Sequence, residues 1–290
     1  MEPVTAVVNP AAGRGAALVV ARRLVEALPA GGVEVAQTRD PAHAREIAEQ
    51  ACAQGRTVLA VGGDGLAGCV AGPVVAAGGV LAMAPAGRGN DFARQLGLPT
   101  DPAAVAEVLL TGRIRHVDVL ESGGRVVLGS VYAGVDSAAN AIANARPGVP
   151  GALVYPYSAV RALLTFRPAG FRLGVDGEEW SARGYSVVVA NSGFYGAGMH
   201  IVPTAEVDDG LLDVLVIPDS SRWTLIASMR EVYSGTHLRR PDVRVRRGRE
   251  VELSIDRPLP VYADGEPFAD APLRVRVRPG ALRVLVPRGG

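Results

Sequence analysis

Thr57-Val-Leu-Ala-Val-Gly-Gly-Asp-Gly-Leu66 runs without a break from a β-rich apolar segment into glycines that surround one aspartate. The apolar part, Val58–Val61, predicts a buried strand of a parallel sheet. Glycines directly after such a strand leave backbone amides exposed around Asp64, at the sheet edge where open α/β folds bind ligands. The alternative is a tight turn in which Asp64 caps the next helix.

Two further glycine-rich loops lie on either side of this stretch in the sequence. Asn9–Gly15 (NPAAGRG) follows the predicted strand Val4–Val8 and, taken alone, could be an ordinary strand-to-helix turn. Pro85–Arg94 (PAGRGNDFAR) follows the predicted strand Val80–Ala84 and adds Arg88, whose guanidinium suits phosphate. Because parallel strands bring their carboxyl ends to one edge, we expect the three loops to converge on one anion-binding site.

Over the first 120 residues, β-rich runs alternate with Ala-rich helical stretches, which is typical of a parallel sheet covered by helices. The two further predicted strands are Val33–Gln37 and His116–Leu120. The predicted helices are Ala16–Leu28, Ala42–Ala53 and Pro102–Leu110, the last capped by Asp101.

After Glu121 the sequence changes to β-branched runs separated by Gly-Gly and Asp-Gly turn signals, which predicts a mainly antiparallel sheet. Helical inserts are expected at Asp136–Ala145, Ala152–Phe166 and Trp223–Tyr233. The change divides the chain into an α/β domain of residues 1–121 and a β-rich domain of residues 122–290, which suits a length of 290 residues.

Composition excludes several kinds of protein. The net charge of +1 gives no reason to expect a nucleic-acid partner. No Lys occurs, so all 30 basic side chains are Arg and a Walker-type Gly-Lys-Ser/Thr phosphate loop is absent. The N-terminus fits no secretory signal, so we expect a cytoplasmic protein with Cys52 and Cys69 as buried, reduced thiols. The uncharged run from Gly65 to Gly87 contains too much Gly and Pro for a membrane span and predicts a buried helix followed by a buried strand.

The second half also carries candidate chemistry. Tyr195–Met199 (YGAGM) is another glycine-rich turn, and Glu206–Asp213 (EVDDGLLD) places carboxylates between strands. In Tyr262–Pro267 (YADGEP), Asp264 fits a hairpin turn, whereas turn chemistry does not explain Glu266. Phosphoryl transfer requires Mg²⁺ and an oriented hydroxyl, which such carboxylates could serve.

Taken together, these motifs resemble the diacylglycerol kinase and sphingosine kinase superfamily, in particular soluble bacterial lipid kinases with a diacylglycerol kinase catalytic domain. The likeness covers nearly the whole chain and rests on Asn9–Gly13, Gly62–Gly65 and Gly87–Ala93. It implies a Rossmann-like α/β domain, a β-sandwich-like second domain and a nucleotide cleft between them.

The resemblance also implies roles for individual residues. Glu266 and Asp64 are the implied catalytic carboxylates, with Glu266 as the proton acceptor. A Mg²⁺ is implied near Asp209, with the backbone carbonyls of Glu206 and Leu211. The residues implied to bind ATP are Asn9, Pro10, Ala11, Ala12, Gly13, Thr38, Gly62, Gly63, Asp64, Gly65, Leu66, Ala67, Gly68, Gly87, Arg88, Asn90 and Asp91.

The chain departs from the family pattern at three of these positions. Leu66 replaces the usual Thr, Gly68-Cys69 replaces an Asn-Glu pair, and Arg88 stands where the family prefers Thr. We therefore keep two alternatives to an ATP- and Mg²⁺-dependent lipid kinase: an NAD kinase-like enzyme, and a non-catalytic nucleotide-binding regulator with an eroded site.

The acceptor and the assembly state are open at this level. Diacylglycerol, a sphingoid base, another lipid alcohol or a polyol would all present a hydroxyl, and a homodimer is one possible assembly. Tyr155–Arg167 mixes Tyr155, Tyr157, Leu163, Leu164 and Phe166 with Arg161 and Arg167, so this helix could rest on the inner membrane face. The alternative is a helix buried against the sheet.

Overall fold

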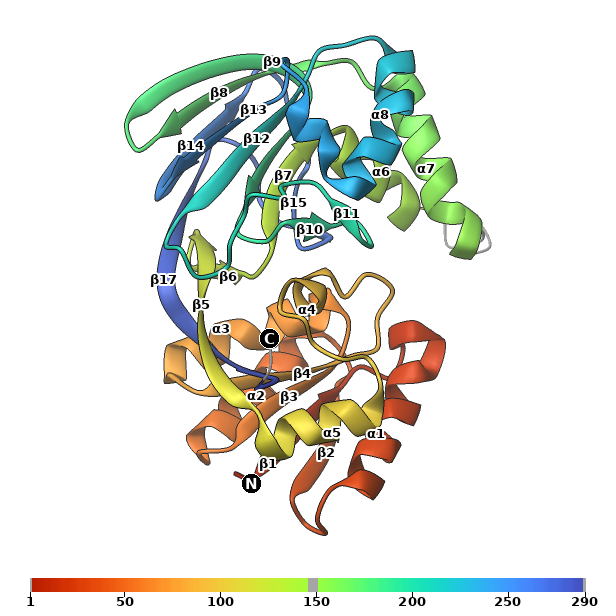
Figure 1. Ribbon diagram of the computed structural model, residues 1–290, viewed down its shortest axis with the longest axis vertical. Coiled ribbons are helices and arrows are strands. Elements are labelled where there is room, and N and C mark those ends of the chain that lie inside the picture. Colours follow the sequence, from red (N-terminus) through yellow and green to blue (C-terminus); the bar gives the residue numbers. More distant parts are fainter. Residues whose placement is uncertain (1, 146–150, 289–290) are drawn as a thin grey trace.

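The computed structural model describes residues 2–145 and 151–288, which form two domains joined by the long strands β5 (Arg113–Ser122) and β17 (Leu273–Val286) (Figure 1). The first domain contains the N-terminal strands and the end of β17, which pairs with β4 (Val80–Pro85) (Figure 1). The second domain holds the remaining strands and helices α6 to α8. The predicted α/β class with a β-sandwich-like second domain is confirmed.

The core of the first domain is a parallel sheet in the order β2-β1-β3-β4. Its strands are β1 (Val4–Val8), β2 (Val33–Gln37), β3 (Thr57–Gly62) and β4 (Val80–Pro85). Its helices are η1 (Ala12–Gly15), α1 (Ala16–Ala27), α2 (Pro41–Ala53), α3 (Asp64–Ala77), α4 (Asp91–Gln95) and α5 (Pro102–Thr111).

Strand periodicity decides which helices cover which face of this sheet. In β3, Val58 and Ala60 pack with α2 and α3, while Leu59 and Val61 pack with α1 and α5. Successive strand side chains point to opposite faces, and both faces of this sheet are apolar. The result is a three-layer α/β/α domain whose strand ends are free to carry the glycine-rich loops.

Local signals set the helix ends. Asp40 and Asp101 cap α2 and α5 by accepting hydrogen bonds from His43 N at 2.8 Å and Ala104 N at 3.1 Å. Gly78, with φ of 61°, ends α3 in the left-handed conformation. The uncharged run is therefore the predicted buried helix and strand, α3 and β4. In the described part of the chain, no helix has the length and apolar character needed to cross a membrane.

The expected parallel arrangement is wrong for the fifth run. β5 (Arg113–Ser122) runs antiparallel to β17 (Leu273–Val286), with Leu285 opposite Ile114 and Val277 opposite Leu120. The end of β17 in turn pairs parallel with β4. Its side chains Leu282, Val284 and Val286 are buried in the core of the first domain. A pairing between residues more than 150 positions apart leaves no local signal in the sequence.

The second domain is mainly antiparallel, as expected. The long strand β9 pairs with β7, β8 and β12. The strands are β6 (Arg125–Val127), β7 (Ser130–Gly134), β8 (Ala169–Val175), β9 (Glu178–Ala190), β10 (Phe194–Tyr195), β11 (Met199–His200), β12 (Leu212–Pro218), β13 (Arg244–Gly248), β14 (Glu250–Ile255), β15 (Val261–Ala263) and β16 (Glu266–Pro267). The helices are α6 (Val135–Asn144), α7 (Gly151–Thr165), α8 (Arg222–Ser234) and η2 (Thr236–Arg239).

The two cysteines are free thiols, so no disulfide joins them. Both are half-buried, which corrects the expectation of full burial. Burial nevertheless raises the pKa of the Cys69 thiol, with smaller contributions from nearby charges. The thiols are therefore poor nucleophiles at neutral pH.

Candidate functional site

The three glycine-rich loops of the first domain meet at the carboxyl edge of the sheet. A Cβ atom built on Gly87 would lie 2.4 Å from the Cα of Gly63, so these two backbones touch where only glycine fits. A Cβ on Gly13 would lie 2.4 Å from the carbonyl oxygen of Ala86. Ala86 N also donates to Gly62 O at 2.8 Å. The predicted convergence of the loops is confirmed.

Side chains within the loops fix the shape of this edge. Asn9 Oδ1 accepts from Ala11 N at 3.0 Å. Asn90 Oδ1 accepts from Gly87 N at 2.9 Å, and Asn90 Nδ2 donates to Gly87 O at 3.1 Å. At the end of β2, Thr38 is buried and donates its hydroxyl proton to Asp40 O at 2.6 Å. Contacts of these residues with a nucleotide stay predictions.

Asp64 connects two of the loops. Its Oδ2 accepts from Asp91 N at 3.0 Å and its Oδ1 from Phe92 N at 3.1 Å. These are unpaired amides of the first turn of α4, so the carboxylate caps α4. Asp64 is therefore a helix cap, as the alternative interpretation holds, but it caps α4 and not the next helix in the chain, α3, of which it is the first residue.

Helix α4 also bonds to the second domain. Asp91, which is buried, accepts from Ala197 N at 2.9 Å and Gly198 N at 2.7 Å in the loop between β10 and β11. Burial raises the pKa of Asp91, and these two amides oppose the rise. Gln95 accepts from Gly193 N at 3.1 Å and donates to Ala205 O at 3.3 Å. The helix that follows the Gly87 loop thus bridges the two domains.

Glu266 approaches the same edge from the second domain. Its Oε1 lies 3.4 Å from the position that a Cβ on Gly65 would take, so its side chain faces the first turn of α3. Glu266 is exposed and can therefore meet a ligand from solvent. The structure thus brings Glu266 of the second domain to Gly65 of the Gly62–Gly65 motif.

Asp264 holds the turn from which Glu266 projects. Its carboxylate accepts three backbone hydrogen bonds, from Leu128 N at 2.8 Å, Gly129 N at 2.9 Å and Ser130 N at 3.0 Å. Desolvation raises the pKa of Asp264 to about 6, although these hydrogen bonds favour the charged form. The hairpin interpretation of Asp264 is confirmed, and the residue supports the site instead of facing solvent.

This shift predicts a pH dependence of stability. The folded-state pKa of Asp264 lies above the ordinary 3.8, so its contribution is fully present below pH 3.8 and is lost as the pH rises through about 6. The loss amounts to about 3 kcal/mol at 1.36 kcal/mol per pKa unit. Urea unfolding between pH 4 and 8 should show it in the wild type and lack it in Asp264→Asn. Asp176→Asn, in an exposed Asp-Gly turn, is the matched control and should keep the wild-type profile.

The three departures from the family pattern have distinct structural settings. Leu66 is buried and packs on Gly62, where a Cβ would meet Leu66 Cδ2 at 2.9 Å. Gly68 leaves room for Asp264, whose Oδ2 lies 3.8 Å from the position of a Cβ on Gly68. Arg88 is exposed at the tip of its loop. At position 66, a leucine that packs in the core thus replaces the side-chain hydroxyl of the family pattern. The guanidinium of Arg88 is added at the exposed rim of the glycine-rich edge.

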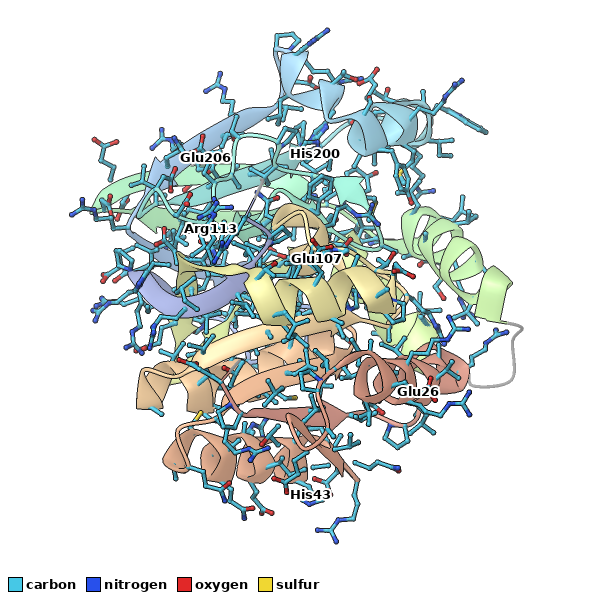
Figure 2. All side chains as sticks on the ribbon, turned by 60° about the horizontal axis from the view of Figure 1, so that its bottom comes forward. Glu26, His43, Glu107, Arg113, His200 and Glu206 are labelled. Atoms are coloured by element: carbon cyan, nitrogen blue, oxygen red, sulfur yellow. The ribbon has the colours of Figure 1, made fainter. Side chains whose placement is uncertain are left out.

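The implied Mg²⁺ ligands lie in an acidic loop, residues 204–211. Glu206 is exposed on the second domain (Figure 2). Asp209 Oδ1 accepts from Leu211 N at 3.0 Å, while its Oδ2 is ion-paired with Arg247. Among residues 2–145 and 151–288, no group of three His, Cys, Asp or Glu side chains is placed to hold a metal ion. Both carboxylate oxygens of Asp209 thus have partners, and a guanidinium stands where a divalent cation would meet this side chain.

Sequence reasoning did not identify two other structural carboxylates. Asp118, almost fully buried, accepts from Gly210 N and Gly280 N, each at 2.7 Å. Asp136, at the start of α6, accepts from Ser186 Oγ at 2.7 Å and Tyr195 OH at 3.2 Å, and burial raises its pKa. Asp118 could have been identified as a structural residue because it is a single Asp within a β-rich apolar run.

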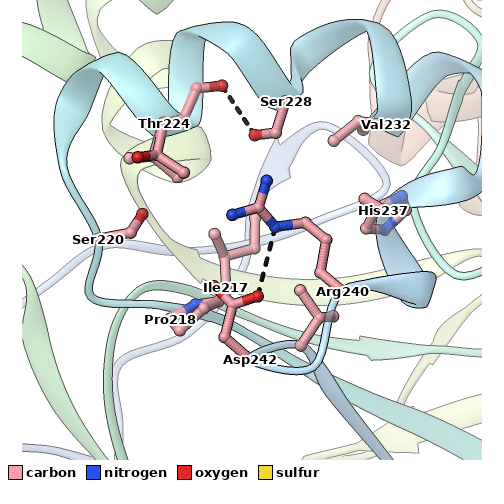
Figure 3. Close-up of a pocket in the computed structure, with 11 residues that line it drawn as sticks. Ile217, Pro218, Ser220, Thr224, Ser228, Val232, His237, Arg240 and Asp242 are labelled. Carbon is pink, nitrogen blue, oxygen red and sulfur yellow. Dashed lines mark hydrogen bonds and ion pairs between the residues drawn. The ribbon is translucent and has the colours of Figure 1, made fainter.

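A small cavity of about 40 Å³ lies in the second domain, between α8 and the end of β12 (Figure 3). Ile217, Leu225 and Val232 line it together with Arg240, which is paired with Asp242. None of the predicted site residues contributes to it, so it is separate from the glycine-rich edge.

Comparisons with known proteins agree with this architecture. Residues 3–122 match the model of the diacylglycerol kinase catalytic domain, and residues 129–286 match the YegS C-terminal NAD kinase beta sandwich-like domain. A diacylglycerol kinase of Mycobacterium tuberculosis (strain ATCC 25618 / H37Rv) is 33% identical over 297 residues, covering 99% of this chain and 96% of that protein.

A probable lipid kinase YegS-like protein of Pseudomonas aeruginosa PAO1 is 33% identical over 257 residues, covering 87% of this chain and 84% of that protein. The crystal structure of a diacylglycerol kinase from Bacillus anthracis str. Sterne superposes with a TM-score of 0.74 at 19% identity, covering 99% and 97% of the two chains. At that identity the likeness shows the fold alone.

Proposed function

This chain belongs to the family of lipid kinases with a diacylglycerol kinase catalytic domain, and we propose that it transfers the terminal phosphoryl group of ATP to a hydroxyl of diacylglycerol or of a related lipid alcohol. The observation that carries the proposal is the meeting of Glu266 with the first turn of α3, beside the three converging glycine-rich loops. This contact supports a reaction in which the loop amides bind phosphate and the carboxylate acts from the other domain.

In the proposed reaction, the amides of the three loops hold the triphosphate, with Arg88 able to reach it from the rim. Glu266 accepts the proton of the lipid hydroxyl while the oxygen of that hydroxyl forms a bond to the γ-phosphorus. The bond from that phosphorus to the bridging oxygen breaks, and ADP leaves. Any Mg²⁺ arrives with ATP as part of the substrate. Positioning and charge neutralisation provide most of the rate enhancement in such reactions.

The deciding experiment is a phosphorylation assay with labelled ATP and a panel of diacylglycerol, a sphingoid base, glycerol and NAD, followed by identification of the product. We expect a phosphorylated lipid and no phosphorylation of NAD. Phosphorylated NAD would favour the NAD kinase-like alternative. Tight ATP binding without turnover on any acceptor would favour a non-catalytic regulator in which Leu66, Gly68 and Arg88 have eroded the site.

We further propose that α7 and α8 contact the membrane that holds the lipid acceptor. Both helices lie on one side of the second domain (Figure 1) and expose apolar side chains: Tyr157, Val160 and Leu164 on α7, and Trp223, Ile226, Met229 and Tyr233 on α8. The side chain of Tyr155 lies outside the described part of the chain. Ser158 and Ala162 of α7 are buried, as is Phe166 directly after it, so α7 is partly a core helix and partly a surface helix.

Vesicle sedimentation tests this contact. The wild type should pellet with anionic phospholipid vesicles, and Trp emission should shift to the blue, because Trp223 is 80% exposed in the free protein. The double variant Val160→Ser/Leu164→Ser should pellet less. Leu110→Ser, which removes an exposed apolar side chain from α5, is the matched control and should pellet like the wild type. Equal pelleting of all three proteins would exclude α7 from the contact.

A further inference from the structure

Arg247 of β13 reaches into the acidic loop of residues 204–211. Its guanidinium is ion-paired with Asp209, and its Nε donates to Asp213 at 3.2 Å. One Nη also lies 3.5 Å from the carbonyl oxygen of Thr204. Two carboxylates and one carbonyl therefore surround a single positive charge, and of these groups the resemblance implied Asp209 as a Mg²⁺ ligand. Oxygen ligands of this kind also suit a hard cation.

The surroundings make this more than an ordinary surface ion pair. Asp213 is 1% exposed and also accepts a hydrogen bond from the hydroxyl of Thr204 at 2.7 Å. Exposed ion pairs contribute little to stability, but a buried carboxylate that loses its cation is strongly destabilising. Arg247 therefore neutralises charge that the fold has already removed from water.

The acidic loop is also packed against the rest of the molecule. Ala205 O accepts from Gln95 of α4, and Val207 O accepts from Asp118 N at 2.6 Å. Asp208 is paired with Arg115 of β5 at 2.7 Å. The order of this loop thus affects the contact between the two domains.

We propose that Arg247 is a built-in cation that takes the place of the divalent ion implied for this loop, so that the loop is ordered without bound metal. A divalent ion at Asp209 would have to displace the guanidinium or lie beside it, and the repulsion between the two positive charges opposes the second arrangement. This inference concerns folding and metal content, and it does not depend on the proposed kinase activity.

Thermal unfolding without nucleotide tests the inference. Protein treated with EDTA is compared with protein in millimolar MgCl₂ at equal ionic strength. The melting temperature of the wild type should stay the same, because a protein is stabilised only by a ligand that binds its folded form. Arg247→Ala should melt several degrees lower in EDTA and recover part of the loss in MgCl₂, where Mg²⁺ can enter the vacated position.

Arg246→Ala is the matched control. Arg246 is the neighbour of Arg247 on β13, and its guanidinium faces the ring of Trp180 and Glu178. This variant should show no response to Mg²⁺. Arg247→Lys keeps the charge, so it should also be insensitive to Mg²⁺.

Two results would overturn the proposal. One is a wild type whose melting temperature rises with MgCl₂. The other is an Arg247→Ala protein that melts lower than the wild type and whose melting temperature does not change with MgCl₂. Should Arg247→Ala fail to fold, equilibrium dialysis of the wild type against Mn²⁺ decides the question. If the wild type binds no Mn²⁺ in the absence of nucleotide, the result supports Arg247 as the built-in cation. One tightly bound Mn²⁺ per chain contradicts it.

Discussion

Glu266→Gln should lower kcat by at least about 100-fold, because general-base catalysis contributes about 10²–10⁴ to the rate. Gln keeps the size of the side chain and its place against Gly65, but it cannot take up the proton of the acceptor hydroxyl. ATP binding should stay within about twofold of the wild type, because Glu266 approaches from the second domain and is not part of the three loops. Coupled ADP release and ATP titration measure the two quantities separately.

A matched control is Asp270→Asn, which removes an exposed carboxylate a few residues further along the chain. It should have wild-type turnover. Glu266→Asp should retain part of the activity, since the base is present but withdrawn by one methylene. If Glu266→Gln turned over like the wild type, Glu266 would have no part in the proton transfer, and the proposed chemistry would need another base.

Gly87→Ala should have the second large effect, through the shape of the nucleotide edge. The added Cβ would lie 2.4 Å from Gly63 Cα and 3.0 Å from Gly63 N, which are backbone atoms that cannot rotate away. Separating the two loops should destabilise the protein by about 1–3 kcal/mol. ATP affinity should fall about tenfold or more, since each 1.4 kcal/mol of distortion in the binding loop is a factor of ten.

Gly72→Ala provides the comparison. Gly72 lies within α3, and a Cβ there would meet nothing within 4 Å beyond its own helix. Ala should therefore leave ATP affinity unchanged, and its effect on stability should stay within about 1 kcal/mol, because the better helix propensity of Ala is opposed by the contact of its Cβ with the ring of Pro73. Urea unfolding and ATP titration of both variants are sufficient. A Gly87→Ala protein with wild-type affinity would show that the contact between Gly63 and Gly87 does not shape a nucleotide site.

The parts of the site that sequence predicts are those with local causes. Val58–Val61 is apolar, with a β-branched valine at each end, which predicts a buried strand. The glycines that follow add nothing to such a strand, so they indicate exposed backbone. Parallel strands then bring Gly13, Gly63 and Gly87 to one edge without further information. Glu266 stood out because the Asp-Gly turn before it explained Asp264 and left the next carboxylate without a structural reason.

The parts that sequence does not predict depend on pairs far apart in the chain. Asp91 and Gly198 are separated by more than a hundred residues, as are Gln95 and Ala205. Arg247 is one of four arginines in Arg244–Arg249, and only the folded structure shows which one meets Asp209. Such contacts follow from topology, which periodicity and turn chemistry do not specify.

The pairing of β17 with β4 has a consequence for biosynthesis. The ribosome completes the first 121 residues early, yet Leu282, Val284 and Val286, which close one side of that domain's core, are made more than 150 residues later. Until they emerge, β4 has an open edge that can pair with other chains. The nascent first domain is therefore incomplete, and prone to aggregate, until these residues have been made.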